Sequence, residues 1–411
     1  MARTVARVVL QGAAVGAVAG AVGLYLSGPV VLSPRHRFFD LRVYRGAASW
    51  WWQGRPLYEF VLPHTSKGFT YPPFAVVVLL PTGLGTLTTA EAFFTAVSAA
   101  LVVVITWALL APVALRHGWS RWFVVALAVP LVVAMEPVRE TLGWGQVEVI
   151  LLALILADVS ALQGGRRWAG IGIGLATAIK VTPGLFVFYL LLSGRRRATV
   201  VAGGTFLAAT ALAFALGPRD SVRFWTRALW ETGRVGAADR TADQSLMGLL
   251  ARLADPAPPD RVVWLLLAGA VVVLGLWRGT RAARAGDELT GVTVTGLTAC
   301  LVSPIAWTHH FVWGVPAVVV LVDVAAGTRS RSWLQAREAA IAAVLVASVF
   351  ASSLPWYFQG ATAHRTGVLP ALGENAYLLI SAALLALLPV RDVRASARTP
   401  APPRPAGSSP R

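Results

Sequence analysis

The chain has 411 residues, of which 56% are hydrophobic and only 13% are charged, and its mean hydropathy is +0.65. A water-soluble globular protein has about 25% charged residues, so this composition excludes an ordinary soluble enzyme or binding module. The formal net charge of +17 comes almost entirely from arginine. No basic face with interleaved aromatic residues stands apart from the apolar segments, so we expect contacts with anionic membrane lipids and no nucleic-acid partner.

Apolar runs of nearly twenty residues recur along the whole chain. Such runs can cross a bilayer as helices, and they do not alternate with period two as barrel strands do. We therefore predict an all-α, multi-pass protein of the plasma membrane with about eleven transmembrane or re-entrant segments. The single cysteine, Cys300, excludes a disulfide framework. Residues 1–390 would form one membrane domain, and residues 391–411, rich in Pro, Ser and Arg, a disordered cytoplasmic tail.

The chain begins with Arg3 and Arg7 ahead of an apolar run at about residues 8–32. A signal peptide begins in the same way, but no convincing small-residue cleavage site follows. We interpret the run as an uncleaved first span with a cytoplasmic N-terminus. The stretch that follows, residues 35–73, would lie outside and reads RHRFFDLRVYRGAASWWWQGRPLYEFVLPHTSKGFTYPP. From Asp40 onward its apolar residues have the spacing of an amphipathic helix, which we expect to lie in the outer membrane interface.

The remaining spans are predicted from apolar runs that end at arginine-rich turns. Residues 72–88 are short and broken by Pro81, which indicates a half-helix or a re-entrant segment. Residues 168–193 carry Lys180 and Pro183 at their middle, which predicts two half-helices with a hinge. The other predicted spans are residues 90–115, 122–137, 147–162, 198–216, 261–277, 288–303, 311–326, 338–354 and 372–389. With the short arginine-rich turns inside, the polar link 136–146 and the long loop 217–260 face outward.

The first outer loop carries the most conspicuous polar residues. Its arginines, Arg37 and Arg45 among them, oppose the usual charge bias of an outer loop, and clustered arginine suits a phosphate ligand. The alternative is that they are solvated at the lipid headgroups. Asp40 is a candidate general base, and the alternative is a helix N-cap or an ion pair with a neighbouring arginine. Tyr71, at the end of the loop, is a candidate substrate-binding residue.

Candidates also occur in later segments. Lys180 would be an intramembrane charge, which is costly and usually functional, unless its amine reaches the interface. His309 and His310 are adjacent, so they are a poor pair of zinc ligands. One could bond a phosphate or sugar, or both could belong to an aromatic belt. Glu136, Gln146 and Gln244 lie in outer links, where they would contact sugar hydroxyls, line a hydrated turn or, for Gln244, help to cap the short helix that follows.

Six of these motifs together resemble glycosyltransferase family 87, membrane mannosyltransferases of the GT-C type. They are FFDLRVYRGAASWWWQGRPLY, FTYPPFAVVVLLP, GWGQVEVILLALILAD, GLATAIKVTPGLF, DQSLMGLL and SPIAWTHHFVW, in that order between about residues 35 and 315. The resemblance implies a GT-C-like helical fold, a polyprenyl-phosphate-mannose donor, a lipid or glycolipid acceptor and an active site on the outer face. It also implies that Asp40 is the catalytic base, that His309 or His310 contacts the donor phosphate or assists proton transfer, and that Lys180 lies on the phosphate side.

Two positions depart from the family pattern, because Glu148 and Asp243 stand where asparagine is expected. They leave the acceptor open between a phosphatidylinositol mannoside, a lipoglycan and another polysaccharide. No motif calls for an organic cofactor, and no residue pattern requires a metal, although a divalent cation is left open. The alternative function is a transporter or flippase of lipid-linked sugars, and a non-enzymatic membrane subunit is a further one. An acid, histidines and cations that converge on one outer cavity would favour the enzyme.

Overall fold

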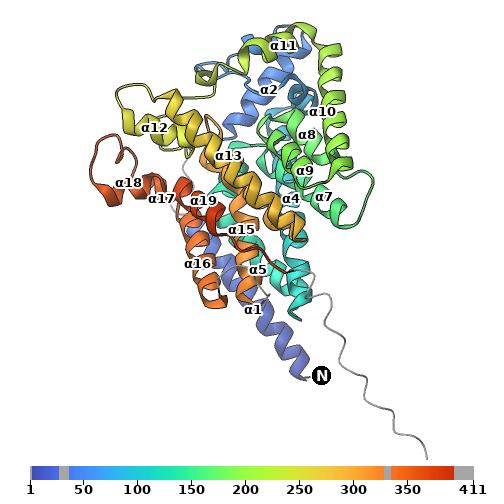
Figure 1. Ribbon diagram of the computed structural model, residues 1–411. Coiled ribbons are helices and arrows are strands. Elements are labelled where there is room, and N and C mark those ends of the chain that lie inside the picture. Colours follow the sequence, from blue (N-terminus) through green and yellow to red (C-terminus); the bar gives the residue numbers. More distant parts are fainter. Residues whose placement is uncertain (1, 27–36, 328–334, 393–411) are drawn as a thin grey trace, which may run out of the picture.

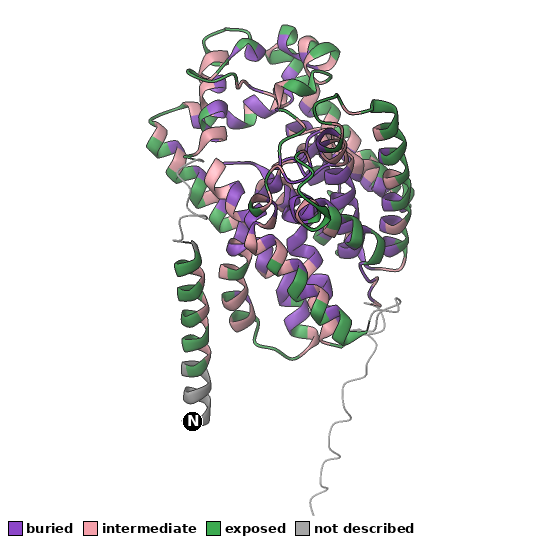
Figure 2. Cartoon of the chain, turned by 90° about the vertical axis from the view of Figure 1, so that its left-hand side faces the viewer, coloured by how far each residue is buried: buried purple, intermediate pink, exposed green. Residues whose placement is uncertain are grey.

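A computed structural model describes residues 2–26, 37–327 and 335–392 of the chain. Within these residues every element of regular secondary structure is a helix, as predicted (Figure 1). The first helix, α1 (Ala2–Leu26), packs mainly against α5 (Arg121–Ala134). Figure 2 shows α1 as a largely exposed helix at one edge, whereas the buried residues gather at the centre of the molecule.

Several helices are apolar enough to cross a bilayer. Within the described residues, four segments meet the requirements of length and apolarity alone, namely α4 (Leu87–Arg116), α10 (Arg196–Leu216), α13 (Arg261–Arg284) and Thr308–Ala325, which includes α15 (Gly314–Ala325). Two bent pairs, α5 with α6 (Glu136–Trp144) and α18 (Val368–Glu374) with α19 (Ala376–Leu387), raise the number to six. The polytopic class is therefore confirmed, whereas the total of about eleven segments stays a prediction.

The amphipathic helix predicted in the first outer loop is present as α2 (Phe39–Trp52). It lies with α11 (Pro218–Arg223) at the end of the molecule opposite the N-terminus (Figure 1). Its buried side chains, Leu41, Val43, Tyr44, Ala47 and Ala48, pack on α3 (Pro73–Leu79) and on the 3-10 turn Leu80–Gly83. Asp40 lies in the first turn of α2, where a carboxylate is stabilised by the helix dipole, but the N-cap residue is Phe38.

The predicted hinge at Lys180 is confirmed. α8 (Ile171–Ile179) ends there, Lys180 is extended, and Pro183 opens the 3-10 turn Thr182–Gly184 before α9 (Leu185–Leu192). Proline removes a backbone donor and disfavours helix in the residue before it, which explains the break. The hinge turns the Lys180 side chain toward α7 (Glu148–Gln163) and α14 (Glu288–Val302), the helices that flank it.

The polar link at residues 136–146 contains a helix that the sequence analysis did not assign. Pro137 stands in the first turn of α6, a position where proline favours a helix start, and Gly145 ends the helix at a φ of 68°. α6 is bent by 69° relative to α5, so it turns back into the protein and buries Glu136 and Glu140. The remaining α-helices are α12 (Leu246–Ala254), α16 (Ala336–Ser352) and α17 (Leu354–Tyr357).

Arg391, which the predicted tail included, belongs to the folded domain. Its guanidinium is buried and bonds Asp287 at 2.5 Å and Asp323 at 2.9 Å. Arg116, at the end of α4, also bonds Asp323 at 2.5 Å. Two buried carboxylates need compensating cations, and this need explains why the chain after α19 is held here. Residues 393–411 of the predicted tail lie outside the described residues.

Candidate functional site

One polar cluster forms around the side-chain amide of Gln146, between α6 and α7. The amide nitrogen donates to Oδ2 of Asp40 at 2.8 Å. The amide oxygen accepts from the hydroxyl of Tyr44 at 2.7 Å and from that of Tyr71 at 2.9 Å. The first outer loop and the 136–146 link therefore meet, which brings three of the candidate residues, Asp40, Tyr71 and Gln146, into direct contact.

Burial keeps both tyrosines of this cluster protonated. It raises the pKa of Tyr71 to about 12 and moves the pKa of Tyr44 well above its ordinary value, because a buried phenolate would lose its hydration. The two hydroxyl oxygens lie 3.0 Å apart. Both groups are consequently hydrogen-bond donors at neutral pH, and they point at the same amide oxygen.

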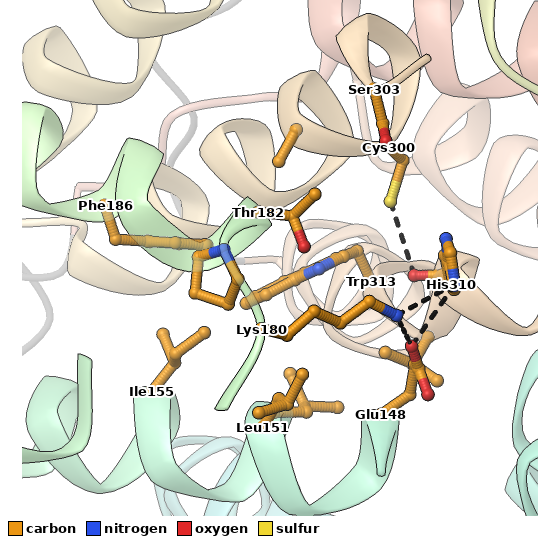
Figure 3. A pocket seen from close by; sticks show the side chains of 14 residues that line it. Glu148, Leu151, Ile155, Lys180, Thr182, Phe186, Cys300, Ser303, His310 and Trp313 are labelled. Atoms are coloured by element: carbon orange, nitrogen blue, oxygen red, sulfur yellow. Dashed lines mark hydrogen bonds and ion pairs between the residues drawn. The ribbon is translucent and has the colours of Figure 1, made fainter. Parts of the chain in front are cut away.

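A second polar cluster forms at the Lys180 hinge. The Lys180 ammonium makes an ion pair with Glu148 and lies 2.9 Å from Nε2 of His310. The same histidine nitrogen lies 3.4 Å from Oε1 of Glu148. Figure 3 shows the lysine side chain extended, with its ammonium between Glu148 and His310. All three residues are largely withdrawn from solvent, so the lysine is a buried cation with one carboxylate beside it.

The two clusters adjoin each other. Gln146 and Glu148 are separated by one residue at the start of α7, and the Lys180 ammonium lies 5.3 Å from the centre of the Tyr71 ring. At that distance a cation over an aromatic face is attracted to it. An acid, an amide, two phenols, a buried cation and an imidazole thus lie in one continuous polar region.

A partly open cavity begins at the second cluster. Glu148, Lys180 and His310 form its polar part, and Thr182, Cys300 and Ser303 add small polar groups. The rest of its wall is apolar and comes from Leu151, Leu152, Ile155, Pro183, Phe186, Ala299, Val312 and Trp313 (Figure 3). Such a wall with a charged end suits a ligand that has a lipid part and a polar head.

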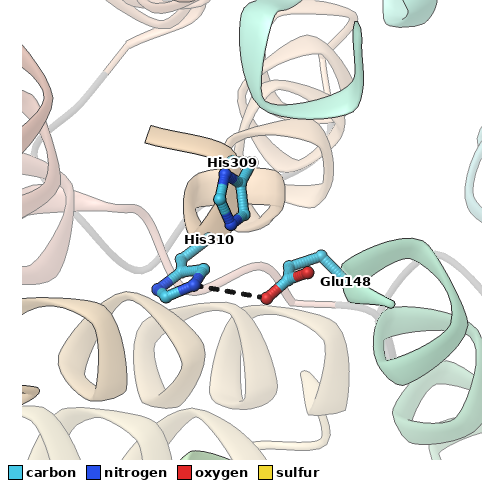
Figure 4. Close-up of side chains that lie close together, drawn as sticks. All are labelled: Glu148, His309 and His310. Carbon is cyan, nitrogen blue, oxygen red and sulfur yellow. Dashed lines mark ion pairs between the residues drawn. The ribbon is translucent and has the colours of Figure 1, made fainter. Parts of the chain in front are cut away.

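In the part of the chain that the structure describes, one group of side chains has donor atoms close enough for a metal ion. These are Glu148, His309 and His310, whose donor atoms all lie within 4.8 Å of one another (Figure 4). The fit is poor, because the Lys180 ammonium already contacts Glu148 and His310. A divalent cation would have to displace a charge of its own sign.

The structure places other candidate residues away from these contacts. The Glu136 carboxylate accepts from Trp356 at 2.7 Å and from the Tyr377 hydroxyl. Gln244 donates to two backbone carbonyls, at 2.7 and 2.8 Å, and is buried. Arg45 donates to the backbone of Gly85 at 2.6 Å, and Arg37 is exposed. The polar groups of Glu136 and Gln244 therefore join distant segments of the fold.

The sequence analysis missed Tyr44 and Glu148 as members of the site. Tyr44 lies four residues after Asp40, so it projects from the same side of α2, and this spacing was the available signal. Glu148 was noted only as a departure from the family pattern. The available signal was that an acid in an apolar segment needs a cation, and Lys180 supplies one. Asp243, the second departure, accepts from the backbone of Ala306 at 2.8 Å and so supports the turn that precedes His309.

The model of glycosyltransferase family 87 matches residues 69–304, more than half of the chain. A polyprenol-phosphate-mannose-dependent alpha-(1-2)-phosphatidylinositol mannoside mannosyltransferase of Mycolicibacterium smegmatis is 34% identical over 75% of this chain and 74% of that protein. A protein of the same name from Mycobacterium tuberculosis is 35% identical over 69% of this chain and 69% of that protein.

A pentamannoside mannosyltransferase of Mycolicibacterium smegmatis with the same donor in its name is 32% identical over 69% of each chain. No solved structure matches the chain. The family model covers Tyr71 and Gln146 of the first polar cluster and Glu148 and Lys180 of the second, and it ends before His310. The chain therefore belongs to glycosyltransferase family 87.

Proposed function

We propose that this chain transfers mannose from a polyprenyl-phosphate-mannose donor to a lipid or glycolipid acceptor of the phosphatidylinositol mannoside or lipoglycan type. The donor and acceptor classes are those named for its relatives. Transfer takes place on the outer face of the plasma membrane with inversion at the sugar, and Asp40 is the general base. The polar region that joins Asp40 to Lys180 through Gln146 and Tyr71 carries this proposal.

Asp40 is suited to the role of base by its surroundings. It is half-buried in the first turn of α2, and the Gln146 amide donates to its carboxylate. A hydrogen bond to the ionised form and the positive end of the helix dipole both favour a carboxylate that can accept a proton. The attacking hydroxyl of the acceptor would give its proton to Asp40 as its oxygen bonds the anomeric carbon.

Lys180 and His310 are suited to the donor phosphate. They stand at the polar end of the cavity, and its apolar wall offers a place for the first units of the prenyl chain. When the bond from the anomeric carbon to the phosphate oxygen breaks, the electron pair stays on that oxygen. A cation and an imidazole within hydrogen-bond reach would stabilise the developing charge. The Glu148 carboxylate partly offsets the positive charge of Lys180, because it lies beside both Lys180 and His310.

The distribution of charge supports the proposed outer-face orientation. Arginine-rich turns belong to the cytoplasmic side of membrane proteins. Arg116 and the buried Arg391 network lie at the ends of α4 and α15, whereas α2 lies at the end opposite the N-terminus (Figure 1). With those turns inside, Asp40 and Gln146 would face the outer leaflet, which is the side that the proposal requires.

The test of this proposal is the Asp40→Asn variant with purified protein and labelled donor. Loss of a general base slows transfer by about 100-fold to 10,000-fold. Donor binding, measured by protection from thermal unfolding, should persist, because the phosphate contacts are assigned to Lys180 and His310. Asp239→Asn, at an exposed position of the second outer loop, is the matched control and should leave transfer unchanged. Near-normal turnover of Asp40→Asn would remove Asp40 as the base.

A further inference from the structure

Both the nitrogen and the oxygen of the Gln146 side-chain amide are hydrogen-bonded within the protein, and this arrangement suggests a role other than contact with sugar. Its nitrogen donates to Asp40, while its oxygen accepts from Tyr44, from Tyr71 and, at 3.2 Å, from the backbone N–H of Val147. Only 5% of the residue is exposed. Both of its hydrogen-bonding ends are engaged inside the protein.

The orientation of the amide follows from its partners. If oxygen and nitrogen exchanged places, the amide oxygen would face the Asp40 carboxylate at 2.8 Å, and two acceptors at that distance repel. The amide nitrogen would then face the N–H of Val147, which pairs two donors. The tyrosine hydroxyls fit either orientation, because a phenol can donate or accept, so Asp40 and the N–H of Val147 decide it. Gln146 therefore presents a donor to Asp40 in a defined direction.

The backbone around Gln146 is fixed to the same turn of α2 that carries Asp40. The N–H of Phe38 donates to the carbonyl of Gly143 at 3.0 Å. A Cβ atom at Gly145 would lie 2.7 Å from the Cβ of Leu41, and the φ of 68° also favours glycine there. The link before α7 and the first turn of α2 are thus in direct backbone contact, which leaves the amide little freedom relative to the carboxylate.

We propose that Gln146 is the positioning residue for Asp40, and that Tyr44 and Tyr71 hold its amide in place. This inference rests on the proposed function of Asp40 as the base. Gln146 has two effects: it aims one carboxylate oxygen, and it stabilises the charged form that accepts the proton from the acceptor hydroxyl. If Gln146 contacted the sugar instead, its replacement would change the binding of acceptor or donor.

The test compares pH–rate profiles of Gln146→Glu and of the wild type. Glutamate keeps the size of the side chain and its acceptor for the tyrosines, but it turns the donor toward Asp40 into a second carboxylate oxygen. Two adjacent carboxylates hold one proton between them, so the acid limb of kcat should move up by about one to three pH units. At neutral pH, kcat should fall by about 10-fold to 100-fold, with little change in either KM.

The double variant Tyr44→Phe/Tyr71→Phe tests the same idea with Gln146 in place. It removes both hydroxyl donors and lets the amide rotate, so kcat should fall by about 10-fold while the donor and acceptor KM values change less. Gln163→Glu and Tyr357→Phe, at exposed positions, are the matched controls and should leave the profile unchanged. Because this double variant leaves Gln146 unchanged, it still tests the inference if a Gln146 variant fails to fold.

The outcomes separate this inference from the proposed function. Suppose that Asp40→Asn is inactive and that Gln146→Glu retains the wild-type acid limb with a raised KM. Gln146 is then a substrate ligand, so this inference is overturned while the proposed function stands. If Asp40→Asn turns over normally, the proposed base and the inference both fall. An inactive Asp40→Asn beside a shifted acid limb in Gln146→Glu supports both.

Discussion

Replacement of Glu148 by glutamine should strengthen donor binding. The Glu148 carboxylate contacts the Lys180 ammonium and lies 3.4 Å from Nε2 of His310. These are the two groups that we assign to the donor phosphate. A bound phosphate would therefore approach a region in which one negative charge already offsets the lysine, and Glu148→Gln removes that charge while it preserves the shape of the side chain.

The size of the effect can be worked out from the contacts. A phosphate oxygen bonded to the far side of the ammonium would lie about 5 to 6 Å from the carboxylate, since each charged hydrogen bond is about 2.8 Å long. Two unit charges at about 6 Å repel by about 3 kcal/mol at an effective dielectric constant near 20. Relaxation and water reduce this value, so we expect the donor KM to fall by about 10-fold to 100-fold.

The assay is initial-rate transfer over a range of donor concentrations, with thermal unfolding of the same preparation. The variant should unfold at a lower temperature, because loss of one partner of a buried ion pair costs about 3 to 5 kcal/mol. Glu338→Gln, at an exposed position of α16, is the matched control. A folded Glu148→Gln enzyme with an unchanged or raised donor KM would show that the phosphate does not bind at Lys180.

Two further predictions concern stability. Burial raises the pKa of Asp243 from 3.8 to about 6, so the folded state should lose up to about 3 kcal/mol as the pH rises through this interval. Asp243→Asn should therefore stabilise the protein by about 1 to 3 kcal/mol at pH 7.5 and hardly at pH 4, and an equal shift in melting temperature at both pH values would contradict this reasoning. Arg391→Met should cost about 3 to 5 kcal/mol, because it leaves Asp287 and Asp323 short of a cation, whereas Arg337→Met at an exposed position should cost almost nothing. Equal melting temperatures for these two arginine variants would disprove that role for Arg391.

The helices themselves were largely predictable from the sequence. Uninterrupted apolar runs such as residues 90–115 and 198–216 appear as α4 and α10, because the bilayer requires a certain length and the backbone must bond itself. The amphipathic spacing after Asp40 predicted α2, and Pro183 predicted the hinge at Lys180. In each case the signal is local, since it depends on residues within a few turns of one another.

The polar contacts were harder to predict, because they join distant parts of the chain. Glu136 bonds Tyr377, which is 241 residues away, and Gln244 bonds the backbone of Glu374, 130 residues away. A polar residue in an outer link looks the same in sequence whether it binds a ligand or braces the fold. Gln146 shows the same difficulty in another form, since its contact with Asp40 depends on how α6 turns back toward α2.

The proposed reaction is tested most directly by transfer of labelled mannose from polyprenyl-phosphate-mannose to endogenous lipids in membranes. Membranes that contain the wild-type chain are compared with membranes that contain Asp40→Asn at the same level. The account predicts a labelled glycolipid with the wild type alone, and the identity of that lipid would name the acceptor. Labelled product in equal amounts from both would contradict Asp40 as the base. If well-inserted wild type forms no product from this donor or from other polyprenyl-phosphate sugars, the transferase account is wrong and a transporter of lipid-linked sugars takes its place.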